Sequence, residues 1–248
     1  MSVPVVALEP RLTPVPPGIG IVAPFDLALD RELWRWTPEP VSLYLTRTAH
    51  LDVPVSVDMA EALGDTGALA ASCRDVAIAD PGVTAYLCTS GSFVGGLSGE
   101  ASLRAAMHQG GARRALTTSG AMLEALEALG ARRVAVATPY DAALTDRLVA
   151  FLAEAGVETT GVGYLGMGED IWRVDGESVA GLARSIPREG ADALFLSCTN
   201  LPTYDVIPAL EAELGIPVLS ANLVTLWAAL RALGELPKAR SERLFGAT

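Results

Sequence analysis

The chain of 248 residues has few of the residues that build metal centres or disulfide frameworks. It contains three cysteines and two histidines. The cysteines are odd in number and show neither CxxC nor zinc-finger spacing, which argues against structural disulfides and a thiolate metal site. His50 and His108 lie far apart in sequence, so a histidine-based metal cluster is not expected either. These absences predict no metal and a reducing cytoplasmic setting.

Long apolar runs and positive charge are also scarce. No run of about 18 apolar residues occurs, so no transmembrane helix and no membrane partner are expected. Residues 1–17 lack the basic start and continuous apolar segment of a signal peptide. With 18 Lys and Arg against 29 Asp and Glu, the net charge is −11, which argues against a nucleic-acid partner. A small anionic substrate stays possible, because local N–H groups can outweigh a distant field.

Half of the residues are hydrophobic, and short buried-looking strands alternate with helical segments along the chain. Strands are expected at 18–24, 41–47, 83–88, 133–138, 157–164, 191–197 and 216–220, and helices at 25–36, 59–79, 101–110, 121–129, 144–155, 177–186, 204–214 and 224–233. This alternation predicts an α/β fold with parallel sheets.

The order of elements between residues 18 and 88 recurs between 133 and 198. It predicts two pseudo-symmetric lobes, each a parallel sheet of about four strands flanked by helices, with the active site in the cleft between them. We expect residues 18–115 and 216–248 to form the first lobe and residues 116–215 the second. Residues 1–17 are rich in proline and are expected to be an irregular lead-in.

Two cysteines stand in matching surroundings, one in each half of the chain. Cys88 and Cys198 each end a short apolar run and are each followed by threonine and a small polar residue. In open α/β folds, ligands bind at the carboxyl ends of strands, and the free N–H groups of the following turn favour a reactive thiolate. The pair therefore predicts two catalytic thiols facing one small substrate. A single such cysteine could equally be a small buried hydrophobic residue, and Cys73 is interpreted in that way.

Polar side chains near these strand ends are candidates for binding a carboxylate. Thr89, Ser90, Thr199 and Asn200 follow the cysteines, although side chains of these types also cap helices. Tyr140 follows the strand at 133–138 and can donate a hydrogen bond to an oxyanion, and Pro24 ends the matching strand of the first half. Thr118 and Ser119 form a hydroxyl cluster ahead of a helix, where capping is again the alternative.

The segments 18–24, 88–93, 117–119, 132–140 and 197–201 resemble those of maleate cis-trans isomerase and the related arylmalonate decarboxylase, within the aspartate/glutamate/hydantoin racemase superfamily. The likeness extends over about residues 18–234. It implies an enzyme without cofactor or metal that acts on a small carboxylic acid and self-associates into a homo-oligomer. It further implies that Cys88 is the nucleophile of the first lobe, that Cys198 is its counterpart, and that Tyr140 contacts a substrate carboxylate.

The sequence also departs from that family. The isomerase has carboxylate-binding asparagines after its first strand and before the segment Arg173–Asp175, whereas this chain has Phe25-Asp26-Leu27-Ala28 and a loop without asparagine at 166–170. Asp26 would repel a dicarboxylate and would suit a substrate that carries an amine or ammonium group.

Several activities remain open at this stage. Cis-trans isomerisation by addition of the Cys88 thiolate is the leading hypothesis. Racemisation of an amino acid or hydantoin by two thiols is the first alternative, and a protein that binds a carboxylate without converting it is the second. A redox role for the thiols is disfavoured, because the chain has no CxxC motif. Decarboxylation is disfavoured because arylmalonate decarboxylase has glycine where this chain has Cys88.

Overall fold

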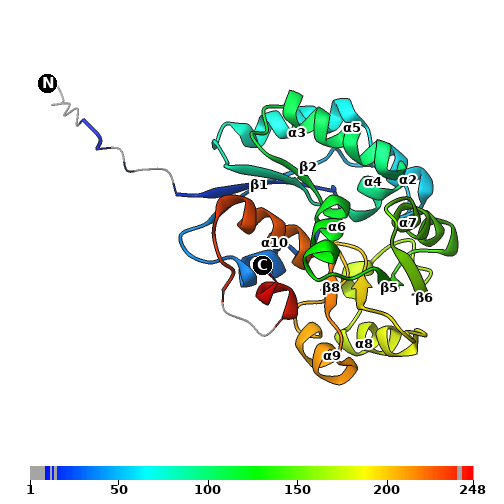
Figure 1. The fold of residues 1–248 in the computed structure, drawn as a ribbon. Coiled ribbons are helices and arrows are strands. Elements are labelled where there is room, and N and C mark those ends of the chain that lie inside the picture. Colours follow the sequence, from blue (N-terminus) through cyan, green and yellow to red (C-terminus); the bar gives the residue numbers. More distant parts are fainter. Residues whose placement is uncertain (1–8, 12, 14–15, 239–241, 248) are drawn as a thin grey trace, which may run out of the picture.

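Two parallel four-stranded sheets form the centre of the molecule (Figure 1). The computed structural model describes residues 9–11, 13, 16–238 and 242–247. The first sheet has the order β2-β1-β3-β4 and contains β1 (Gly18–Ala23), β2 (Ser42–Arg47), β3 (Val83–Tyr86) and β4 (Ala115–Thr117). The second has the order β6-β5-β7-β8 and contains β5 (Arg133–Thr138), β6 (Glu158–Tyr164), β7 (Ala193–Leu196) and β8 (Val218–Ser220). The two orders are related by adding four to each strand number, which confirms the predicted internal repeat and fold class.

Helices cover the faces of both sheets. They are α1 (Asp30–Trp36), α2 (Val57–Leu63), α3 (Thr66–Ala77), α4 (Thr89–Phe93), α5 (Gly96–Gln109), α6 (Thr118–Ala128), α7 (Ala142–Glu154), α8 (Gly176–Ser185), α9 (Ile207–Leu214) and α10 (Ala221–Leu233). Side chains cap the N-termini of six of them, namely Ser56, Asp65, Thr117, Asp141, Asp175 and Ser220. Each cap accepts a backbone N–H that the helix itself cannot satisfy, so these boundaries follow from the local sequence.

The cysteines follow the central strands of the two sheets. Every residue of β1, β3 and β7 is buried, and β5 is buried from its second residue onward. Strands covered on both faces by helices read as continuous apolar runs, which explains why they were recognisable in the sequence. Because β3 and β7 end inside the molecule, the residues that follow them lie between the lobes rather than in solvent.

The predicted division of the chain into lobes differs from the sheets in two places. Residues 216–248 were assigned to the first lobe, but β8 pairs in parallel with β7 of the second sheet. Residues 116–215 were assigned to the second lobe, but β4 pairs with β3 of the first sheet. Strand β4 has only three residues after two arginines, too short for an apolar run to mark it. Helix α10 does return to the first lobe, where it packs on α6, β3 and β4.

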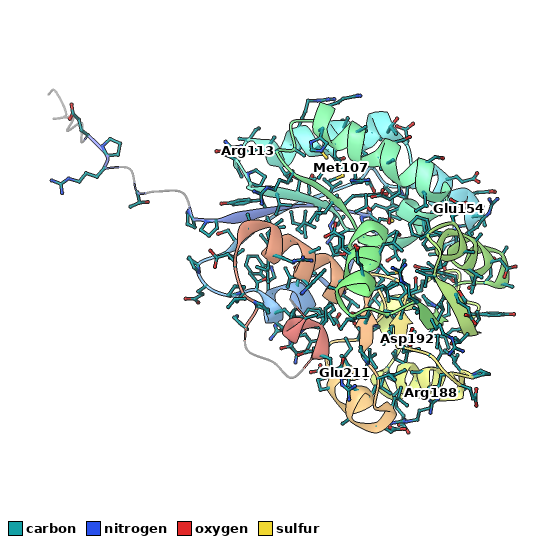
Figure 2. The ribbon with its side chains drawn as sticks, viewed as in Figure 1. Met107, Arg113, Glu154, Arg188, Asp192 and Glu211 are labelled. Atoms are coloured by element: carbon teal, nitrogen blue, oxygen red, sulfur yellow. The ribbon has the colours of Figure 1, made fainter. Side chains whose placement is uncertain are left out.

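Two carboxylates join the lobes on opposite sides of the cleft. On one side, Glu32 of α1 accepts hydrogen bonds from the backbone N–H groups of Thr203 and Tyr204 at 2.7 and 2.9 Å, and from Asn222 Nδ2 at 3.0 Å. On the other side, Glu154 at the end of α7 (labelled in Figure 2) accepts the N–H of Leu97 in α5 at 2.9 Å. The lobes are therefore tied together at both flanks of the cysteine region.

Candidate active site

Cys88 and Cys198 line the same small cavity between the lobes. The other residues around it are Pro24, Asp26, Val55, Met59, Leu63, Thr89, Ser90, Tyr140, Ile171, Thr199 and Asn200. The cavity has a volume of about 20 Å³, which is enough for about one water molecule. The structure thus brings the two thiols together across the lobes, as the matching sequence frames indicated.

Cys88 sits at the N-cap of α4, with polar groups close to its sulfur. The Ser90 hydroxyl is 4.0 Å from Cys88 Sγ, and the Tyr86 hydroxyl, which donates to Leu63 O at 2.6 Å, also hydrogen-bonds with the thiol. A Cβ atom added at Gly91 would come within 2.6 Å of the Tyr86 hydroxyl oxygen and 3.1 Å of Cys88 Sγ. The absence of a side chain at Gly91 therefore makes room for the thiol.

Cys198 has an unusual backbone conformation, with φ of 88°. A positive φ brings Cβ of an L-residue too close to the backbone, and such residues often mark functional sites. The Asn200 N–H donates to Cys198 Sγ at 3.4 Å, and the Tyr140 hydroxyl also hydrogen-bonds with this thiol. The conformation turns the thiol toward the cavity instead of continuing the strand.

Burial disfavours the thiolate form of both cysteines. Burial raises the pKa of Cys88 to about 11, an effect that the Gly91 N–H and the Tyr86 and Ser90 hydroxyls oppose and that the Asp26 carboxylate reinforces. Burial likewise raises the pKa of Cys198 to about 12, against the Asn200 N–H and the Tyr140 hydroxyl. Since burial is the larger cause for both, admission of water or of a polar ligand favours the thiolates.

Hydroxyl groups gather beside the thiols. Thr89, 1% exposed, has a buried Oγ1 with no hydrogen-bond partner among the described residues. The Tyr140 hydroxyl accepts from Ser197 Oγ at 3.4 Å, and burial raises its pKa well above the usual value, so it remains a donor. A buried hydroxyl without a hydrogen-bond partner raises the free energy of the folded protein. A ligand oxygen beside Thr89 and Tyr140 would supply the missing partner.

Not every predicted binding residue reaches the cavity. Thr118 and Ser119 do not line it. Instead, Thr118 Oγ1 donates to Tyr86 O at 3.2 Å, and Ser119 Oγ hydrogen-bonds with Ser92 Oγ at 2.7 Å behind α4. Asn200 does line the cavity, but its side chain is used to hold the loop after β1, donating to Asp26 O at 3.0 Å and accepting from Ala28 N at 2.8 Å.

A second, wider pocket of about 390 Å³ lies outside the cysteine cavity. The two spaces share five lining residues, which form the partition between them: Asp26, Val55, Met59, Ile171 and Asn200. The loops that carry Val55 and Gly168 meet over this region, where Val55 N donates to Gly168 O at 2.7 Å. The inner cavity and the outer pocket therefore adjoin, and the loops that carry Val55 and Gly168 touch where the two spaces meet.

Several residues of the site went unnoticed in the sequence. Met59, Leu63 and Ile171 form an apolar part of the cavity wall, and nothing in their local sequence separates them from core residues. Tyr86 could have been found, because residues i and i+2 of a strand point to the same side and Tyr86 precedes Cys88 by two positions.

Within the described residues, no three His, Cys, Asp or Glu side chains come together in a way that could hold a metal ion. None of the helices there has the length and apolar character needed to span a bilayer.

Similarity to known proteins agrees with this geometry. Residues 57–245 match the family model described as arylmalonate decarboxylase. The chain belongs to the arylmalonate decarboxylase family. Relatives in this family include arylmalonate decarboxylase of Bordetella bronchiseptica, 39% identical over 164 residues that make up 64% of this chain and 68% of the relative. Maleate isomerase of Nocardia farcinica is 34% identical over 173 residues, or 66% and 68% of the two chains.

Solved structures from the same family superpose along nearly the whole chain. A liganded variant of arylmalonate decarboxylase, with a glycine changed to cysteine and a cysteine to serine, has a TM-score of 0.83 and 32% identity over 94% of this chain and 100% of that one. A Nocardia farcinica maleate cis-trans isomerase variant with a covalently bound succinylcysteine intermediate has a TM-score of 0.80 and 26% identity, with 92% and 98% covered. The predicted family is confirmed, and with it the prediction that the chain is an enzyme.

Proposed function

We propose that the protein is a cofactor-independent isomerase of a small carboxylic acid and that Cys88 and Cys198 perform the reaction. The observation that carries this proposal is the single cavity that both thiols line, together with the unpartnered Thr89 hydroxyl. The maleate isomerase relative, in which a cysteine has been observed covalently bound to a succinyl group, supports the same chemistry.

In the proposed reaction, the Cys88 thiolate adds to one carbon of a cis carbon–carbon double bond that is conjugated to a carboxylate. A C–S bond forms, and the π electrons move through the neighbouring carbon to the carboxylate as an enolate. Thr89, Ser90 and Tyr140 donate hydrogen bonds to that charge. The former double bond is now single and rotates. When the enolate collapses, the double bond re-forms, the C–S bond breaks and the thiolate leaves, so no net proton or electron is transferred.

The thiolate must form before this addition. Because burial is the main reason why the pKa of Cys88 is about 11, opening the two loops and admitting a solvated ligand lowers that pKa. The Gly91 N–H and the Ser90 hydroxyl then stabilise the negative sulfur. Cys198, on the other face of the cavity, holds the substrate or exchanges a proton with it.

Two other reactions use the same cavity. In a racemase, one thiolate would remove the α-proton of the substrate and the other thiol would return a proton to the opposite face. In a decarboxylase, which the 39% identity to arylmalonate decarboxylase favours, Cys198 alone would protonate the enolate left after loss of CO₂. Cys88 has no role in that reaction, so its presence supports isomerisation.

Proton NMR in heavy water separates the three reactions. Maleate, substituted maleates, aspartate, glutamate, hydantoins and arylmalonates are incubated with the enzyme. We expect conversion of a cis-unsaturated acid to its trans isomer without labelling of the substrate. Deuterium at an α-carbon would indicate racemisation instead, and loss of CO₂ would indicate decarboxylation.

Variants of the cysteines test the assignment. Cys88→Ala should reduce isomerisation at least about a thousandfold, as expected when a nucleophile is removed. Cys73→Ala is the matched control, because Cys73 is a buried free thiol of α3 outside the cavity. Full turnover by Cys88→Ala on every substrate would end the proposal. We further propose a cytoplasmic setting, because the cysteines are free. The family resemblance also implies a homo-oligomer, and light scattering measures the oligomeric state.

A further inference from the structure

The outer pocket, which forms the mouth of the cysteine cavity, is lined by acidic side chains that would repel a dicarboxylate. Four carboxylic side chains line the outer pocket, namely Asp26, Asp52, Glu169 and Asp170, and none of its described lining residues is lysine or arginine. An aromatic side chain, Trp172, lines it as well and is 47% exposed. Arg173 already lies over the Trp172 ring at 5.7 Å and pairs with Asp170 at 3.5 Å. The remaining carboxylates, Asp26, Asp52 and Glu169, are the groups that can attract an organic cation.

Asp26 connects this mouth to the reacting groups. It lines both the outer pocket and the inner cavity, and its charge acts on the thiols of both Cys88 and Cys198. Burial raises the pKa of Asp26, and the Asn200 side chain and Arg47 offset that effect only in part. Arg47 is itself bound to the backbone oxygens of Phe25 and Leu27. Asp26 is therefore a partly buried carboxyl group whose charged form is only partly compensated by its neighbours.

Among the residues that line the inner cavity but not the outer pocket are hydroxyl groups that can bind an anion. They include Thr89, 1% exposed, whose Oγ1 has no hydrogen-bond partner among the described residues, and the donors Ser90 and Tyr140. Met59 and Ile171 form the apolar wall between these hydroxyl groups and the mouth. A ligand that spans the two spaces would thus meet hydroxyl donors, then apolar side chains, then carboxylates.

We propose that the substrate is a small monocarboxylate with an ammonium group at its other end, and that Asp26 is the residue that selects this class. The proposal rests on the function given above and narrows its substrate. The substrate carboxylate binds at Thr89, Ser90 and Tyr140, the unsaturated carbons lie between the two thiols, and the ammonium group faces Asp26. The bound ammonium also offsets the charge that disfavours both thiolates. The carboxylates of the outer pocket attract such a zwitterion and repel a second carboxylate.

Binding of saturated ligands tests this selection without depending on turnover. Dissociation constants of 4-aminobutanoate and succinate, which have the same chain length, are measured by calorimetry for the wild type, Asp26→Asn and the charge-retaining Asp26→Glu. The matched control is Glu61→Gln, which removes an exposed charge on α2 outside the cavity. The wild type should bind 4-aminobutanoate about tenfold or more tightly than succinate. Asp26→Asn should reduce that ratio about tenfold, and the other two variants should retain it.

A preference of the wild type for succinate, an unchanged ratio in Asp26→Asn, or no binding of either ligand would overturn the selection. Turnover then separates this inference from the proposed function, with (Z)-4-aminobut-2-enoate and maleate as substrates. Faster conversion of maleate would refute the selection while leaving the isomerase intact. Selective binding of 4-aminobutanoate without isomerisation of any cis acid would refute the isomerase while leaving the selection intact.

Discussion

Glu32 should contribute a large share of the stability of the cleft. Its side chain is 8% exposed and accepts four hydrogen bonds, from Thr203 N, Tyr204 N, Asn222 Nδ2 and Thr203 Oγ1. In Glu32→Gln, the amide oxygen can keep the two backbone bonds, and the amide nitrogen can donate to the Thr203 hydroxyl, but it cannot accept from Asn222 Nδ2. A buried amide donor left facing another donor costs about 1–3 kcal/mol, so the free energy of unfolding falls by up to about 3 kcal/mol.

For a chain of this size, a loss of up to about 3 kcal/mol corresponds to a fall in Tm of up to about 12 °C. Differential scanning calorimetry measures it, with Glu61→Gln as the control that removes an exposed glutamate and should change the free energy of unfolding by less than about 0.5 kcal/mol. Hydrogen exchange offers a local readout, because the amides of Thr203 and Tyr204 should lose protection before those of β7. An unchanged Tm, or equal protection of those two amides in both proteins, would refute the reasoning.

Three further predictions concern the thiols. Gly91→Ala should reduce the free energy of unfolding by about 1–3 kcal/mol and slow turnover, because the new methyl group meets Tyr86 and Cys88. Denaturant titration measures the free energy of unfolding. It should be unchanged in the control Gly99→Ala, where the methyl group meets nothing within 4 Å. The rate of Cys88 alkylation in the free enzyme, measured by peptide mass spectrometry, should rise with pH up to about pH 10 without a plateau, because burial raises the pKa of Cys88 to about 11. A plateau near pH 7 would contradict this. Cys198→Gly should have a Tm about 2–4 °C higher than Cys198→Ala, because the positive φ at this position disfavours any residue with a Cβ by about 1 kcal/mol. A lower Tm for Cys198→Gly would count against this backbone conformation.

The sequence predicted the repeated strands and the meeting of the two cysteines because both signals are local. A buried parallel strand shows as an apolar run, and its end shows as a change to Thr and Ser or Asn. The three-residue β4 and the five-residue α4 left no such signal, since neither is long enough for a period to repeat. Membership of β8 in the second sheet depends on pairing with β7, which no local pattern encodes.

The binding residues divide in the same way. Thr89 and Tyr140 follow directly from strand ends and lie in the cavity, whereas Thr118 and Ser119 have the same chemistry but point behind α4. Only tertiary packing distinguishes the two pairs. The inter-lobe role of Glu32 was equally hidden, because a glutamate in an amphipathic helix looks like a solvent-facing residue until its partners, about 170 positions away along the chain, are seen.

The hydrogen bond between Val55 and Gly168 has a consequence for the speed of the enzyme. The inner cavity has room for about one water, so an acid of four carbons needs more space there than this arrangement provides. We expect the two loops to part for arrival and again for departure, and the frequency of that motion then limits kcat. Crystals of the free protein should take up an acid by soaking less readily than crystals grown in its presence.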